Sequence, residues 1–158
     1  MASGTANSTS NNNTTNAANL SLPTRVIAVL VLSALVDATY WVLWFTDRSA
    51  VASNNTVPYV DFQDAFVAAD SWLAICLLAG IWTLSTRRPV ALFWLLAGGG
   101  AGIYLFAMDV LYDIEHRVWW TSGAGGWIEL AINAVTLSVS VGMLRWSWRR
   151  RLLLLGQA

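Results

Sequence analysis

Four long apolar runs constrain this chain more than any other feature of its sequence, and they cover residues 26–45, 65–84, 90–112 and 127–146. A helix of about 20 residues rises about 1.5 Å per residue and so crosses the roughly 30 Å hydrocarbon core of a bilayer. Inside lipid the backbone N–H and C=O groups must bond within their own segment, so each run is predicted to be helical. The predicted fold is therefore all-α: a four-helix transmembrane bundle with up-down-up-down topology.

The composition excludes several classes of protein. Hydrophobic residues make up 56% of the chain and charged residues only 11%, whereas a soluble domain carries about 25% charged residues. The nine basic residues, all Arg, balance nine acids to a net charge of zero, which excludes a nucleic-acid binder with a broad basic face. The single cysteine excludes a disulfide framework.

The chain divides into three parts. Residues 1–23 form a polar tail without charges, which is predicted to be disordered because it cannot bury enough apolar surface. Residues 24–151 form the transmembrane domain, and residues 152–158 a short C-terminal tail. Within the domain, a polar loop is predicted over residues 46–63 and a flexible connection over residues 113–126, which ends in a glycine-rich turn.

Arginine residues give the predicted orientation, because Arg at span ends favours the cytoplasmic side. Arg48 and Arg117 fall on one side of the four-span arrangement. The other seven fall on the opposite side: Arg25, Arg87, Arg88, Arg145, Arg149, Arg150 and Arg151. Both termini are therefore predicted to be cytoplasmic, in a multi-pass protein whose main partner is the lipid bilayer.

The acidic residues show the opposite segregation. All nine lie in the outer half of the predicted four-span arrangement, on the side away from the cytoplasm. Four of them lie inside spans: Asp37, Asp70, Asp109 and Glu129. A carboxylate in the middle of a span costs about 2.5–3.5 kcal/mol, and less near the interface. Asp37 and Asp70 are the deeper pair and need an explanation, whereas Asp109 and Glu129 lie near helix ends and could simply reach water.

Helical phase brings these carboxylates toward one vestibule that faces outward. Carboxylates that lie side by side in a low dielectric must share protons or hold a cation. Carboxylates with one imidazole suit manganese, iron or zinc, whereas oxygen ligands alone suit calcium or magnesium. We therefore predict a site for a divalent metal ion or a proton, with two deep ligands, two shallow ligands and two residues at the rim: Asp37 and Asp70, Asp109 and Glu129, and Asp113 and His116. A lone His at a helix end is more often a polar surface residue than a ligand.

A second hypothesis is a non-catalytic structural or partner subunit of a membrane complex. Gly98 and Gly102 form a small-xxx-small pair, a pattern that lets two membrane helices approach closely. This face is a candidate for binding a partner helix or a second copy of the chain. The polar stripes would then serve helix packing.

An enzyme is a less favoured class. The sequence contains no glycine-rich phosphate loop, no Ser/His/Asp set and no His-x-x-x-His motif. Tyr112-Asp113 resembles half of the intramembrane aspartyl protease signature, but the Gly-x-Gly-Asp half is absent. Any acid–base chemistry would fall on the carboxylates.

Three sequence motifs carry a resemblance to a protein family. Asp-Phe-x-x-Ala-Phe-x-x-Ala-Asp-x-Trp-Leu-Ala begins at Asp61, Arg-Arg-Pro-x-Ala at Arg87, and Met-Asp-Val-Leu-Tyr-Asp-x-Glu-His at Met108. Together with a Trp-Ser-Trp-Arg-Arg-Arg end, the chain resembles small uncharacterised four-span bacterial integral membrane proteins over residues 24–151. The resemblance implies a bacterial inner membrane, and it implies no activity and no ligand.

Overall fold

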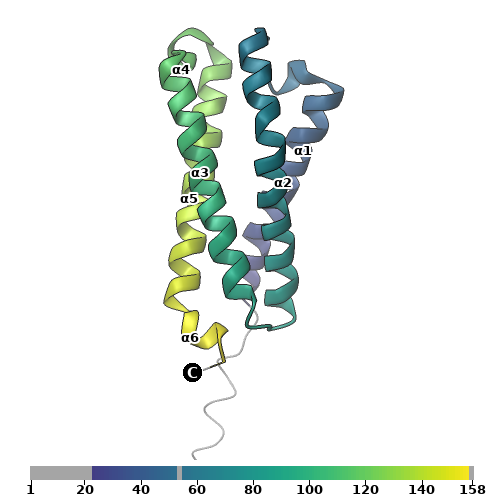
Figure 1. The fold of residues 1–158 in the computed structure, drawn as a ribbon, viewed down its shortest axis with the longest axis vertical. Coiled ribbons are helices and arrows are strands. Elements are labelled where there is room, and N and C mark those ends of the chain that lie inside the picture. The colour runs from purple at the N-terminus through teal and green to yellow at the C-terminus, as the bar shows by residue number, and fades with distance from the viewer. Residues whose placement is uncertain (1–22, 53–54, 157–158) are drawn as a thin grey trace, which may run out of the picture.

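Four long helices form the body of the protein and lie side by side along its long axis (Figure 1). The computed structural model describes residues 23–52 and 55–156, so most of the tail predicted to be disordered lies outside the described residues. All four helices are long and apolar enough to cross a membrane, which indicates a multi-pass membrane protein. They are α1 (Thr24–Thr46), α2 (Val57–Ser85), α3 (Ala91–Glu115) and α5 (Ala124–Arg149).

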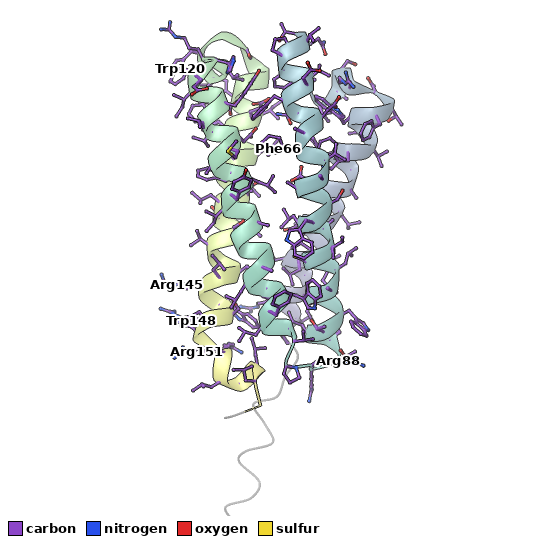
Figure 2. The ribbon with its side chains drawn as sticks, viewed as in Figure 1. Phe66, Arg88, Trp120, Arg145, Trp148 and Arg151 are labelled. Carbon is purple, nitrogen blue, oxygen red and sulfur yellow. The ribbon has the colours of Figure 1, made fainter. Side chains whose placement is uncertain are left out.

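Three short helices complete the described part of the chain: the 3₁₀ helix η2 (Arg48–Ala50), α4 (Val118–Thr121) and α6 (Arg151–Leu154). Helices α4 and α6 lie at opposite ends of the bundle (Figure 1). We call these the α4 end and the α6 end. Arg88, Arg145 and Arg151 all lie toward the α6 end, and Trp120 lies at the α4 end (Figure 2).

The second helix begins earlier than the apolar run predicts, at Val57, with Pro58 in its first turn, where proline is well tolerated. Residues 57–63 of the predicted polar loop are therefore helical. The polar side chains that indicate a loop in the sequence bond to α1 instead: Trp44 Nε1 donates to Asp64 Oδ1 at 2.8 Å. The predicted connection over residues 113–126 is likewise mostly helical, since it contains the end of α3, all of α4 and the start of α5.

Each long helix packs on the long helix that follows it in the chain. Contacts join α1 to α2, α2 to α3, and α3 to α5, but among the described residues α1 and α5 do not pack extensively on each other. Close backbone contacts between the first and last long helices are therefore sparse in the described part of the chain.

Two clusters of buried side chains stabilise the bundle, one toward the α6 end and one at the α4 end. The cluster toward the α6 end is aliphatic and includes Leu30, Leu77 and Leu95. The cluster at the α4 end consists of Trp44, Tyr59, Tyr112 and Val118. We call the second cluster the aromatic cap, and its tyrosines pack at 6.0 Å between ring centroids.

The small face of α3 packs inside the chain. A Cβ atom at Gly102 would overlap the side chain of Ser140 on α5, and one at Gly98 would lie 3.1 Å from the Cβ of Cys76 on α2. The close approach that the small-xxx-small pair predicts therefore occurs within the bundle. Pairing of this face with a partner helix or a second copy stays a prediction, and it would require α5 to move away.

Hydroxyl groups along the helices are mostly satisfied by their own backbone. Thr83 Oγ1 donates to the carbonyl of Ala79 at 2.6 Å, and Ser147 Oγ to that of Met143 at 2.7 Å. Such bonds to the preceding turn let a hydroxyl lie in an apolar helix without a partner on another helix. These two residues therefore do not link helices through their hydroxyls.

Candidate functional site

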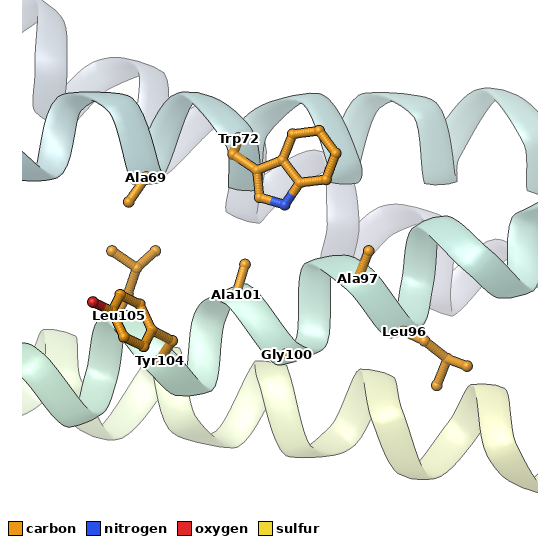
Figure 3. Close-up of a pocket in the computed structure, with 8 residues that line it drawn as sticks. All are labelled: Ala69, Trp72, Leu96, Ala97, Gly100, Ala101, Tyr104 and Leu105. Carbon is orange, nitrogen blue, oxygen red and sulfur yellow. The ribbon is translucent and has the colours of Figure 1, made fainter.

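Two cavities stand out in the described part of the chain, and they differ in chemistry. The first is a groove of about 420 Å³ between α2 and α3, lined by small and apolar residues that include Ala69, Trp72 and Gly100. Figure 3 shows Ala69 and Trp72 of α2 facing Ala97 and Ala101 of α3, and no charged residue lines the groove. Apolar membrane grooves of this kind suit hydrocarbon, so this groove is not the candidate site.

The second cavity, of about 300 Å³, lies among the four long helices and is lined by carboxyl groups from each of them: Asp37, Asp70, Asp109 and Glu129. The sequence pattern predicts this convergence, and the structure confirms that the four side chains line one cavity. We call it the carboxylate cavity. No Arg or His is among the described residues that line it. Uncompensated carboxylates in one enclosed space carry a high electrostatic cost.

Three carboxyl groups form a tighter cluster at one wall of this cavity. Asp109 and Asp113 lie one turn apart on α3, and Glu129 reaches them from α5. One oxygen of each residue lies within 4.8 Å of an oxygen of the other two. Asp113 is fully buried and Glu129 is 7% exposed. This trio, which we call the acidic trio, is the part of the site with the geometry of an ion-binding centre.

Polar neighbours from α2 and α5 hold the acidic trio in place. Tyr59 donates its hydroxyl to Glu129 Oε1 at 2.7 Å. Asn133 Nδ2 donates to Asp113 Oδ2 at 3.1 Å. Asp113 Oδ1 is buried and has no hydrogen-bond partner in the described part of the chain. A buried oxygen that accepts nothing costs about 1–3 kcal/mol, which a proton or a cation there would offset.

Asp37 and Asp70 lie at the α1–α2 side of the same cavity and outside the acidic trio. The indole Nε1 of Trp41 donates to Asp70 Oδ2 at 3.0 Å. Asp37 of α1 and Asp70 of α2 both line the cavity. The structure therefore separates the deep pair predicted from the sequence from the carboxylates that lie closest together.

The two residues predicted at the rim, Asp113 and His116, differ in burial and in location. Asp113 is not at a rim, because it is the most deeply buried carboxylate of the trio. His116 lies at the end of α3, is exposed, and stacks on Tyr112 with 4.0 Å between ring centroids. Its Nδ1 lies 3.0 Å from the carbonyl oxygen of Tyr112. The structure therefore does not bring His116 into the group of carboxylates.

The aromatic cap packs at the α4 end of the bundle, next to the acidic trio. Trp44 and Tyr59 are each 1% exposed, and Val118 of α4 is 3% exposed. Tyr59 and Val118 belong to segments predicted to be loops. They are buried because α2 starts early and because the connection after α3 contains α4.

Sequence patterns missed Tyr59 as a site residue because it lies in the segment predicted to be a loop. Its signal was present: Tyr59 and Gln63 are four residues apart, so they share a helix face, and both are buried. Trp41 is a second site residue that the sequence patterns do not indicate. Its contact with Asp70 depends on the relative rotation of α1 and α2, which the sequence does not encode locally.

Comparison with protein-family models, curated proteins and solved structures gave no match to this chain. The resemblance to four-span bacterial membrane proteins therefore stays a prediction. The geometry of the site is the basis for the functional proposal that follows.

Proposed function

We propose that this chain is an integral membrane protein that binds a cation, either a proton or a divalent metal ion, at the acidic trio of Asp109, Asp113 and Glu129. The observation that carries the proposal is the mutual approach of three carboxyl groups within 4.8 Å in a buried place. Three ionised carboxylates cannot lie so close in a low dielectric without a compensating positive charge.

The ligand chemistry narrows the metal alternatives. The trio offers oxygen atoms alone, with no imidazole or thiol. Hard cations such as calcium, magnesium and manganese prefer oxygen ligands. Ligand oxygens about 2.3–2.6 Å from a calcium ion can lie up to about 5 Å apart, which fits the spacing of the trio. A soft, sulfur-seeking ion is disfavoured.

A thermal titration tests the metal alternative. The full-length protein in nanodiscs is titrated with manganese, calcium, magnesium or zinc while its unfolding is followed. An ion at 100 times its Kd is expected to add about 2.7 kcal/mol to the free energy of unfolding. Asp113→Asn and Glu129→Gln should abolish this gain, and the matched control Asp61→Asn, at an exposed position on α2, should retain it.

Infrared spectroscopy tests the proton alternative. A shared proton gives a carbonyl band of a protonated carboxyl group, and Asp113→Asn should remove that band while Asp61→Asn leaves it unchanged. If no metal raises the stability and no such band is lost in Asp113→Asn, the trio holds neither ion and the proposal is wrong.

We further propose that the four spans run up-down-up-down with the α6 end and both termini in the cytoplasm of a bacterial inner membrane. The distribution of arginines supports this, because Arg88, Arg145 and Arg151 lie toward the α6 end (Figure 2). Three guanidinium groups there lie over tryptophan rings: Arg88 on Trp82 at 4.6 Å, Arg150 on Trp146 at 5.4 Å and Arg151 on Trp148 at 4.7 Å. Such pairs suit a membrane interface.

Cysteine labelling in intact cells checks this orientation. In a Cys76→Ser background, Ser49→Cys and Ser85→Cys place single thiols at two exposed positions at opposite ends of the bundle. A membrane-impermeant maleimide should label the cysteine at position 49 in intact cells and the one at position 85 only after lysis. The reverse pattern would contradict the proposed orientation.

A further inference from the structure

The carboxylate cavity opens sideways, between α1 and α5. These two helices do not pack extensively on each other among the described residues, and both contribute to the cavity lining. Val36 on α1 and Val135 on α5 line the cavity and are 60% and 61% exposed. In a membrane, such exposed apolar side chains in the middle of a span face hydrocarbon. The side of the cavity between α1 and α5 therefore faces the bilayer.

The lining combines negative groups with a largely apolar wall. Besides the four carboxyl groups, the lining includes the amide of Asn133, which is 2% exposed and whose Nδ2 donates to Asp113. Apolar residues such as Phe66, Leu77 and Met143 form much of the rest. Small-molecule pockets typically combine an apolar lining with a few convergent polar groups, and their volumes begin at about 300 Å³.

Asp37 and Asp70 give the cavity a second acidic place away from the acidic trio. The Trp41 indole fixes Asp70 through a 3.0 Å hydrogen bond. Tyr40 lines the same cavity and supplies an aromatic ring beside these carboxyl groups. Carboxylates with an aromatic face are the usual surroundings of a bound organic ammonium group.

We propose that the carboxylate cavity binds an organic ammonium ion with an apolar body, which reaches the cavity from the bilayer through the opening between α1 and α5. The ammonium group lies against Asp37 and Asp70, and the apolar body lies along the apolar wall. This inference goes beyond the proposed function, because it uses Asp37 and Asp70 and a different class of cation. It can therefore hold or fail independently of ion binding by the acidic trio.

Binding of benzyltrimethylammonium to the full-length protein in nanodiscs tests the proposal. This probe carries a permanent charge, so it binds neither as a proton donor nor as a metal. Its neutral isostere neopentylbenzene, in which carbon replaces nitrogen, is the matched ligand control. Saturable binding of the cation, with affinity roughly tenfold or more above that of the isostere, is the expected result. Equal affinity for the two compounds would overturn the proposal.

Four variants locate the site. Asp37→Asn and Asp70→Asn should each weaken binding of the cation roughly tenfold or more, because the charge is lost while the shape is kept. Thr136→Phe, which fills the cavity from α5, should block binding without touching a carboxylate. Asp61→Asn should leave the affinity unchanged, because Asp61 is exposed on α2 and is not among the residues that line the cavity. Unchanged affinity in both the Asp37 and the Asp70 variants would overturn the proposal.

Discussion

Replacing Trp44 with Ala is expected to lower the free energy of unfolding by about 3–5 kcal/mol, because a fully buried aromatic side chain leaves a cavity that its neighbours cannot fill. Trp44 is 1% exposed and packs on Tyr59, with 6.2 Å between the ring centroids. It also donates its indole N–H to Asp64. Denaturation of the purified protein in detergent micelles, followed by circular dichroism, measures the loss.

The same substitution should open the acidic trio to water from the α4 end. Faster hydrogen–deuterium exchange of the backbone amides around Asp113 is the expected sign. Trp120→Ala is the matched control, because Trp120 also lies at the α4 end but is 68% exposed, and it should change neither measurement appreciably. Trp44→Phe keeps an aromatic ring but removes both the hydrogen bond to Asp64 and the second ring of the indole, so its cost should lie between those of Trp120→Ala and Trp44→Ala. Equal losses for Trp44→Ala and Trp120→Ala would show that the aromatic cap does not stabilise this end.

Gly102→Leu is expected to be the second most damaging substitution, at about 3 kcal/mol, since overpacking a tight contact forces helices apart. Even a Cβ atom at this position overlaps the side chain of Ser140. A leucine therefore requires α3 and α5 to separate, and Asp109 and Asp113 on α3 would move away from Glu129 on α5. Loss of thermal stability, together with loss of any metal-dependent or proton-dependent signal of the trio, is the expected result.

Gly100→Leu provides the control within the same helix. A Cβ atom at Gly100 meets no other group within 4 Å, so this leucine extends into open space at the α2–α3 groove (Figure 3). Its stability should be unchanged or slightly raised, because leucine favours helix more than glycine does. If both variants were equally stable, the close contact between α3 and α5 would not be a determinant of the fold.

Much of the helical framework is predictable from local patterns. Apolar runs of sufficient length predict four spanning helices, because each run must satisfy its own backbone in lipid, and the structure contains four helices of this kind. The helix ends are less predictable. Polar residues such as Gln63 and Asp64 indicate a loop by composition, yet they belong to α2 because their partners, Tyr40 and Trp44, lie on a neighbouring helix.

The candidate site is likewise only partly predictable from the sequence. Helical phase predicts that Asp37, Asp70, Asp109 and Glu129 turn toward one another, and they do line one cavity. It places Asp113 and His116 together at a rim, three residues apart on one stripe. In the structure Asp113 is buried inside α3, whereas His116 follows the last residue of α3, is exposed and stacks on Tyr112.

The sequence by itself determined the four spans and the separation of acids from arginines along the chain, because both follow from the local balance between lipid and water at each segment. Only the tertiary structure decided which carboxyl groups meet, that Tyr59 and Asn133 hold them, and that exposed apolar side chains of α1 and α5 line the cavity. Those features depend on how the helices rotate and shift against one another. That arrangement is set by contacts between residues far apart in the chain, such as Tyr59 with Glu129 and Gly102 with Ser140.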